Sequence, residues 1–271
     1  CYGGSPSLST VRPPHVICGC PGRIYDMLCR RIIRPAHIQM FVLDEADKML
    51  TDTFESQIAD ILHFLNKDIQ LCFFSATFQP NIEDTIQYFA KNANFKPLTK
   101  IKIDSTMLTL EGIQQYFVAV YDDMQKYLTI ANLLSSLTIS QCFVYCISVQ
   151  RVIDLYESLR NDDCPVCCLH SKMSPEMREQ TYQEFKQGKH RLLISTDLTA
   201  RGLDIQQVNY VINFDLPNDV HTYLHRIGRS GRWGRKGVAI NLVTQRNISQ
   251  LKEIERYYNP QINELPKLDL L

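Results

Sequence analysis

Short apolar runs alternate with amphipathic segments along most of this 271-residue chain. In the first hundred residues, three runs are apolar enough for strands covered on both faces: residues 15–19, 39–44 and 70–76. Between the last two runs, apolar side chains recur at helical spacing, at positions 54, 58, 61, 62 and 65. The periodicity therefore predicts strand–helix–strand units.

The same alternation begins again after about residue 105. Six further strands are expected, at residues 114–120, 141–146, 164–170, 190–196, 209–215 and 237–243. Helices are predicted over 148–160 and 175–187, and the second has a suitable N-cap, Ser174, followed by Pro175 at its first position. Repeated strand–helix–strand units imply parallel sheets with right-handed crossovers. We expect an α/β protein with two domains, the first one shortened, joined by a link near 101–113.

Short polar segments follow three of the predicted strands: Asp-Glu-Ala-Asp at 44–47, Ser-Ala-Thr at 75–77 and Ser-Thr-Asp at 195–197. Ligands of parallel sheets bind beyond the carboxyl ends of the strands. There, Asp44 can hold Mg²⁺ and the adjacent Glu45 can orient or activate a water for phosphoryl transfer. Each segment alone has a plainer interpretation, such as acids at the positive end of a helix. Their joint occurrence predicts a site.

The charge of the chain is balanced overall but unevenly distributed. The formal net charge is zero, and 45% of the residues are hydrophobic and 21% charged. No apolar run approaches the ~20 residues of a membrane span. Residues 220–237 contain no acid, and Arg226, Arg229 and Arg232 lie there among glycines. Such arginines can neutralise a phosphoryl-transfer transition state or contact phosphates.

Ten cysteines require an interpretation. Cys164 and Cys167 have the spacing of zinc ligands, but no second pair of Cys or His follows at zinc-finger distance. Most of the others lie in apolar runs. Reduced thiols in the core are therefore favoured over a zinc site or a disulfide framework, and reduced thiols fit an intracellular compartment.

Five motifs occur in a specific order: CPGR (20–23), DEAD (44–47), SAT (75–77), STDLTARGLDI (195–205) and HRIGRSGR (225–232). With them the chain resembles the DEAD-box ATP-dependent RNA helicases. Segments 108–118, 212–219, 231–244 and 255–266 resemble the translation-initiation factor 4A branch of that family. The resemblance implies two RecA-like domains: the C-terminal part of the ATP-binding domain over 1–105, and the helicase C-terminal domain over 106–271.

The resemblance also implies roles for individual residues. Asp44 would contact Mg²⁺ through water, Glu45 would be the catalytic carboxylate, and Asp47 and His225 would couple the two domains. The implied catalytic set is Asp44, Glu45, Asp47, His225, Arg229 and Arg232. The implied nucleotide contacts are Gly202, Asp204, Arg229, Arg232 and Trp233. The implied contacts to the RNA backbone are Pro21, Gly22, Arg23, Arg178 and Thr196. Ser75 and Thr77 would link the ATP state to RNA binding.

The implied function is ATP-dependent RNA unwinding, in which RNA-stimulated ATP hydrolysis opens short duplexes in translation initiation or mRNA metabolism. The cofactors would be ATP and Mg²⁺. The partners would be RNA, read with little sequence preference because the contacts are to the backbone, and a HEAT-repeat scaffold protein. The expected location is the cytoplasm or the nucleus, with no membrane association.

Some features depart from the family pattern. Cys20 stands where Thr is usual and Pro175 where Gln is usual, so a weaker hold on RNA is expected. The phosphate loop A-x-x-G-x-G-K-[ST] is not found in the sequence. We therefore expect a chain that begins midway through the first domain and hydrolyses ATP poorly by itself. Two alternatives remain open: a truncated, catalytically impaired fragment that binds RNA or a scaffold, and a DNA helicase or general nucleotide-binding protein.

Overall fold

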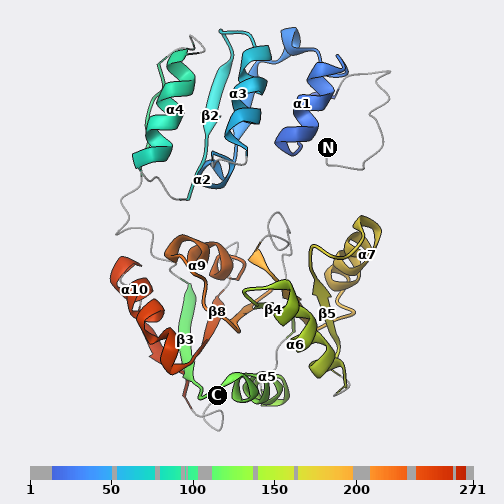
Figure 1. The fold of residues 1–271 in the computed structure, drawn as a ribbon, viewed down its shortest axis with the longest axis vertical. Coiled ribbons are helices and arrows are strands. Elements are labelled where there is room, and N and C mark those ends of the chain that lie inside the picture. The colour runs from blue at the N-terminus through green and yellow to red at the C-terminus, as the bar shows by residue number, and fades with distance from the viewer. Residues whose placement is uncertain are drawn as a thin grey trace. The chain divides into compact units, whose positions relative to one another are not determined.

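The computed structural model describes residues 14–50, 54–76, 80–92, 95, 97–102, 112–136, 140–161, 164–197, 208–230, 236–258 and 261–266. The chain divides into two compact units, residues 1–102 and residues 103–271, which we call the first and second units. Figure 1 colours the chain by residue number. None of the helices in the described ranges is long and apolar enough to cross a membrane.

The first unit contains a parallel strand pair packed with helices. Strand β1 (Met40–Leu43) pairs in parallel with β2 (Gln70–Phe73). Its helices are α1 (Pro21–Cys29), the 3₁₀ helix η1 (Pro35–His37), α2 (Ala46–Met49), α3 (Glu55–Phe64) and α4 (Pro80–Asn92). The core joins Met27 of α1, Leu43 of β1, Ile58 and Leu62 of α3 and Phe89 of α4. The strands predicted at 39–44 and 70–76 are thus confirmed.

The strand predicted at residues 15–19 is wrong. These residues form no regular structure, and the side chain of Val16 is 76% exposed. An apolar run becomes a strand only when a neighbouring strand accepts its backbone hydrogen bonds. In the described part of the first unit, β1 and β2 pair only with each other, so residues 15–19 have no such neighbour there.

The second unit is built on a seven-stranded parallel sheet with the strand order β5-β6-β4-β7-β8-β3-β9. The strands are β3 (Ile113–Ala119), β4 (Cys142–Tyr145), β5 (Val166–Leu169), β6 (Leu192–Ser195), β7 (Tyr210–Asn213), β8 (Gly237–Val243) and β9 (Ile262–Glu264). Every neighbouring pair is parallel. All six strands predicted for this half are confirmed, and β9 is an addition.

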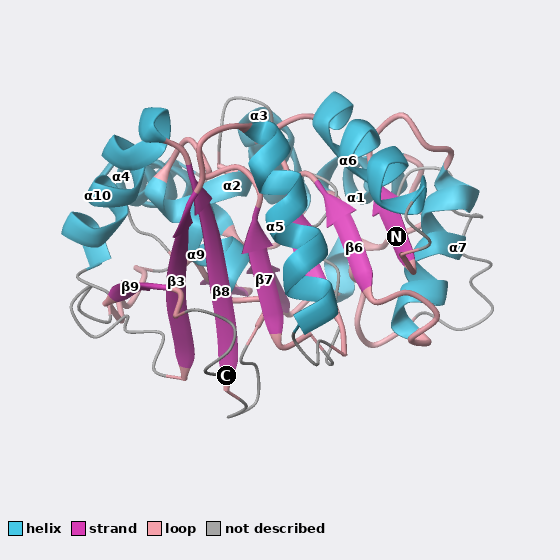
Figure 2. Cartoon of the chain, turned by 90° about the horizontal axis from the view of Figure 1, so that it is seen from below, coloured by secondary structure: helices cyan, strands magenta, loops and turns pink. Residues whose placement is uncertain are grey.

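Helices cover both faces of this sheet, as Figure 2 illustrates with α5 crossing in front of the strands. The helices are α5 (Asp123–Ser136), α6 (Val149–Asn161), α7 (Pro175–Lys186), α9 (Val220–Ile227) and α10 (Ile248–Tyr258), with a short 3₁₀ helix η4 (Gln245–Asn247). Alternate residues of β4 face opposite sides. Cys142 and Val144 join the core under α5 and α6, whereas Phe143 and Tyr145 join the core with α7, α9 and α10.

The predicted helix 175–187 is confirmed together with its cap. The hydroxyl of Ser174 accepts the backbone N–H of Met177 at 3.2 Å, and Pro175 begins the helix. The predicted α/β class with parallel sheets is confirmed as well. With helices on both faces of the seven-stranded sheet, its strand ends are the part where polar side chains can gather.

Candidate functional site

The acidic turn after β1 has an unusual backbone. Glu45 lies in the left-handed region, with φ 53° and ψ 45°. Among the described residues, Arg31 is the only other non-glycine residue with a positive φ. This conformation costs roughly 1–2 kcal/mol for a residue with a side chain, and such strain concentrates at functional sites. The exposed Asp44 supports the turn, because its Oδ1 accepts the backbone N–H of Glu45 at 2.9 Å.

Backbone and side-chain hydrogen bonds hold the acidic turn against the Ser-Ala-Thr segment. The N–H of Asp47 donates to Oγ of Ser75 at 3.3 Å, and the N–H of Ala46 donates to the carbonyl of Phe74 at 2.9 Å. Asp47 is buried, at 8% exposure. The structure therefore brings together Asp44, Glu45, Asp47 and Ser75 within the first unit. Thr77 lies outside the described residues.

The acidic turn fits Mg²⁺ through a single carboxylate. No group of three or more His, Cys, Asp or Glu side chains that could hold a metal ion occurs among the described residues. Mg²⁺ is usually held by one or two carboxylates, with waters and substrate phosphates completing its shell, rather than by an all-protein cage. The exposed carboxylate of Asp44 is a donor of this kind.

The CPGR segment begins α1. Pro21 is the first helical residue, after Cys20. A Cβ added to Gly22 would lie 3.2 Å from Oε1 of Gln57, which is tighter than ordinary contact. Nη1 of Arg23 donates to Oδ2 of Asp26 at 3.2 Å, and the Arg23 side chain is 19% exposed. Arg23, which was predicted to contact the RNA backbone, is thus already paired with Asp26, and the sequence analysis did not predict this pairing.

In the second unit, the end of β6 is joined to α9. Thr196 is buried, and the next residue, Asp197, accepts two hydrogen bonds from Arg226, from Nε at 2.6 Å and from Nη2 at 2.8 Å. Arg226 is only 1% exposed. Asp197 and Arg226 were not among the predicted site residues. The acid-free run around Arg226 was the available signal, but it was interpreted as a set of arginines that neutralise a transition state or contact phosphates. For Arg226 that interpretation is wrong, because its side chain is buried against Asp197.

The remaining predicted residues of this unit are partly described. His225 lies on α9 and Arg229 follows its C-cap, Gly228; both side chains are half-buried. Burial raises the pKa of Tyr145 to about 12, against the opposing charges of Arg229 and Arg226. Arg178 lies in the first turn of α7 and is half-buried. Four predicted nucleotide contacts lie outside the described residues: Gly202, Asp204, Arg232 and Trp233.

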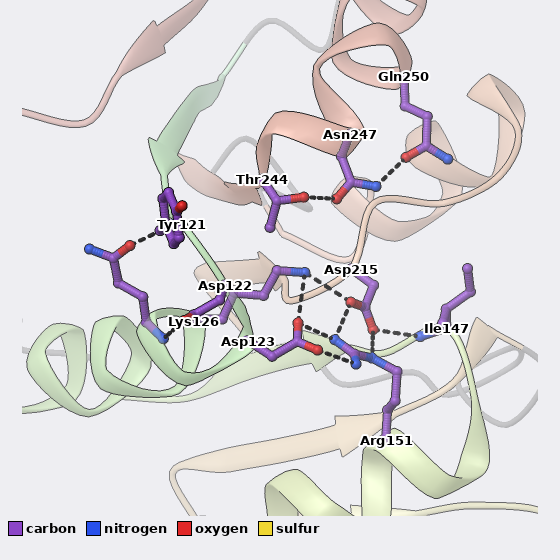
Figure 3. Close-up of polar contacts among 11 residues, drawn as sticks. Tyr121, Asp122, Asp123, Lys126, Ile147, Arg151, Asp215, Thr244, Asn247 and Gln250 are labelled. Carbon is purple, nitrogen blue, oxygen red and sulfur yellow. Dashed lines mark hydrogen bonds and ion pairs between the residues drawn. The ribbon is translucent and has the colours of Figure 1, made fainter.

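A cluster of four charges lies at the ends of β4 and β7 (Figure 3). The carboxylate of Asp215 accepts hydrogen bonds from Nε and Nη2 of Arg151, at 2.6 and 2.7 Å, and from Nζ of Lys126 at 3.0 Å. Arg151 also donates to Asp123 at 2.8 and 2.9 Å. Burial alone would raise the pKa of Asp215, but Arg151 and Lys126 outweigh burial and hold this pKa below its ordinary value. We call these four residues the Asp215 cluster.

Comparisons with known proteins agree with this arrangement. Residues 1–85 match the DEAD/DEAH box helicase family, and residues 125–234 match the helicase conserved C-terminal domain. The chain is 42% identical to the ATP-dependent RNA helicase fal1 of Aspergillus oryzae over 98% of its own length and 67% of the relative's. The chain belongs to the DEAD-box helicase family.

Two further comparisons place this helicase chain within the family. It is 43% identical to the ATP-dependent RNA helicase eIF4A of Eremothecium gossypii, over 93% of its length, and it spans 62% of that relative. The structure of S. cerevisiae Dbp5 bound to RNA and ADP BeF3 superposes with a TM-score of 0.87 at 31% identity, covering 97% of this chain and 68% of Dbp5. The predicted family and its 4A-like branch are confirmed, as is the RecA-like fold class.

Proposed function

We propose that the protein is an ATP-dependent RNA helicase of the 4A type, acting in translation initiation or mRNA metabolism. The observation that carries this proposal is the strained acidic turn. A left-handed Glu45 beside an exposed Asp44, in a turn whose Asp47 N–H donates to Ser75, is costly for a structural turn and reasonable for a catalytic one. The names and RNA-bound state of the similar proteins support the substrate class.

In this proposal, each unit contributes one half of the chemistry. Asp44 would hold Mg²⁺ through water, and Mg²⁺ bound with ATP would supply charge neutralisation at the phosphates. Glu45 orients the attacking water and accepts its proton. His225 and Asp47 couple the units, and Arg229 supplies positive charge from beyond α9. Arg232, Gly202, Asp204 and Trp233, which lie outside the described residues, would complete the nucleotide contacts, and Thr77 would act with Ser75.

The RNA contacts are proposed for Pro21, Gly22, Arg23, Arg178 and Thr196. Because these positions offer backbone groups, arginines and a hydroxyl, they suit the phosphate backbone better than base edges. Little sequence preference follows. A HEAT-repeat scaffold partner and residence in the cytoplasm or nucleus remain predictions from the family resemblance.

The test combines RNA binding with ATP hydrolysis by the purified chain. We expect a fluorescent single-stranded RNA to bind in preference to DNA of the same sequence. ATP hydrolysis should be slow, because the sequence contains no phosphate loop, and should rise when RNA is added. Glu45→Gln should reduce hydrolysis by about 10²–10⁴-fold, the usual contribution of a general base, without weakening RNA binding. Glu55→Gln, the same change at the start of α3, is the control and should leave hydrolysis unchanged.

The outcomes separate the alternatives. RNA binding without any hydrolysis would favour the non-catalytic, RNA-binding alternative. Equal binding of DNA and RNA would favour a helicase or nucleotide-binding protein of another class. Absence of both RNA binding and hydrolysis would refute the proposal.

A further inference from the structure

A chain of buried hydrogen bonds runs beneath α9, and Arg226 is its centre. Besides its two bonds to Asp197, Nη1 of Arg226 donates to Oδ1 of Asn213 at 3.0 Å and to the backbone carbonyl of Asp215 at 2.6 Å. The guanidinium carbon lies 5.0 Å from the centroid of the Tyr145 ring, a cation–π distance. One buried side chain of α9 therefore contacts the ends of β4, β6 and β7.

The series of hydrogen bonds continues across the sheet to β8 and β3. Nδ2 of Asn213 donates to Oδ1 of Asn241 at 2.8 Å, and Nδ2 of Asn241 donates to the hydroxyl of Tyr223 at 3.2 Å. The Tyr223 hydroxyl donates to Oε1 of Gln115 at 2.9 Å. Tyr223 and Arg226 are three residues apart and share one face of α9. The helix is thus held to the sheet by polar contacts at two successive turns.

The ion pair joins two segments to which the proposed function gives different ligands. Asp197 directly follows Thr196, which would contact the RNA backbone. Arg226 follows His225, which would couple the units, and precedes Arg229, which would contact the nucleotide. We propose that Arg226 is a positioning residue: its two-pronged bond to Asp197 fixes the spacing between the RNA-contacting end of β6 and the nucleotide-contacting end of α9. This inference rests on the proposed function of the same site.

Stability alone is a weak explanation for this pair. Well-packed apolar residues of similar volume commonly replace a buried ion pair without loss of stability. A guanidinium that donates twice to one carboxylate, however, fixes both distance and orientation, which an apolar contact or an ammonium group does not. The side chain of Asp197 is 28% exposed, so water can reach it when Arg226 is replaced. We therefore expect Arg226→Met to fold with a lowered melting temperature, because Asn213 and the Asp215 carbonyl also lose this donor.

The experiment compares Arg226→Met with Arg151→Met in the full chain. Arg151 is a matched control, because it lies in the same unit and also donates twice to one carboxylate. We would measure the Kd of a short fluorescein-labelled oligouridylate by anisotropy, at equal folded fraction by circular dichroism. Arg226→Met should raise the Kd about tenfold, the equivalent of one lost charge-assisted hydrogen bond. Arg151→Met should lower the melting temperature and leave the Kd within about twofold of the wild type.

Amide hydrogen exchange and a conservative variant supply independent measurements. In Arg226→Met, exchange should become faster at residues 196–197 and 224–230 and stay unchanged in α5. Arg226→Lys keeps the positive charge but cannot donate from two nitrogens to Asp197 in the same geometry. Compared with Arg226→Met, it should therefore restore the melting temperature more completely than the RNA affinity. If Arg226→Met does not fold, the lysine variant decides: wild-type RNA affinity in Arg226→Lys would overturn the inference.

The inference and the proposed function can fail separately. RNA binding could weaken in Arg178→Ala but be the same in Arg226→Met and Arg151→Met. That result would reject the positioning role and leave the proposed function intact. A wild-type chain that does not bind the oligouridylate would reject both.

Discussion

Replacing Asp215 by Asn should destabilise the second unit more than any surface charge change. The carboxylate accepts hydrogen bonds from Arg151, Lys126 and the backbone N–H of Ile147, the last at 3.2 Å. Lys126 is 3% exposed and Asp215 is buried as well. Without this carboxylate, Lys126 keeps an ion pair with Asp123, whose Oδ1 lies 3.8 Å from Nζ of Lys126. A buried ammonium group would then be only weakly compensated.

The expected loss follows from the burial of the partners. Removing one partner of a buried ion pair typically costs about 3–5 kcal/mol. Two features favour the lower end. Asn retains an oxygen that can accept the Ile147 N–H, and Arg151, with 29% of its side chain exposed, keeps Asp123. We therefore expect a loss of about 3 kcal/mol, equivalent to a fall in melting temperature of about 6–12 °C for a domain of this size.

Differential scanning calorimetry can follow the transition of the second unit separately from that of the first. The matched control is Asp154→Asn on α6, an exposed acid that accepts a hydrogen bond from Gln150 at 2.8 Å. It should change the free energy of unfolding by less than about 0.5 kcal/mol. Adding Lys126→Met to Asp215→Asn should recover part of the loss, because the uncompensated charge is removed. Equal effects of Asp215→Asn and Asp154→Asn would refute the electrostatic reasoning.

Three further predictions concern pH, backbone strain and RNA. Because the folded-state pKa of Asp215 lies below its ordinary value, its contribution is present above the unfolded-state pKa of about 3.9 and is lost as pH falls through the folded-state pKa. Calorimetry should show the stability gap between wild type and Asp215→Asn closing below about pH 4, and a gap constant down to pH 2 would contradict this. At Glu45, the positive φ should make Glu45→Gly more stable than Glu45→Ala by about 1 kcal/mol in urea denaturation, the reverse of the usual order, and a more stable alanine variant would show the turn to be unstrained. Arg178→Ala should reduce the log–log salt slope of RNA binding by about 0.7, whereas Arg160→Ala on α6 should leave it unchanged, and equal slopes would remove Arg178 from the interface.

Local sequence determined the fold where burial is complete. All four residues of β4 are buried, and a continuous apolar run of that length reads as a strand covered on both faces. β9 was missed because only one of its three residues, Ile262, is buried, so it has no apolar pattern. Residues 15–19 carried the pattern, but no strand lies beside them in the described part of the first unit. Strand pairing depends on the partner, which periodicity does not specify.

The candidate site was predictable only in part. The Ser-Thr-Asp segment lies at the end of β6, and the acidic turn lies beside Ser75. Both positions follow from polar segments that come directly after predicted strands. The pairing of Arg226 with Asp197 was not predictable, because it spans 29 residues of sequence and depends on the sheet order and on the buried face of α9. The left-handed φ of Glu45 left no local signal either, because no Gly or Asn marks the turn.

The two polar networks of the second unit meet at Asp215, and this explains why so much charge is buried there. Its carboxylate belongs to the Asp215 cluster, which fixes α5 and α6, while its backbone carbonyl accepts Nη1 of Arg226 and so supports α9. Helices on opposite faces of the sheet are therefore anchored at the same strand end. An apolar core would bury these helices as well, but without directional contacts it would not fix their angles. The side chains of α9 that would meet a ligand need that direction, and the buried contacts of Arg226 beneath them provide it, whereas the Asp215 cluster supports the packing of α5 and α6.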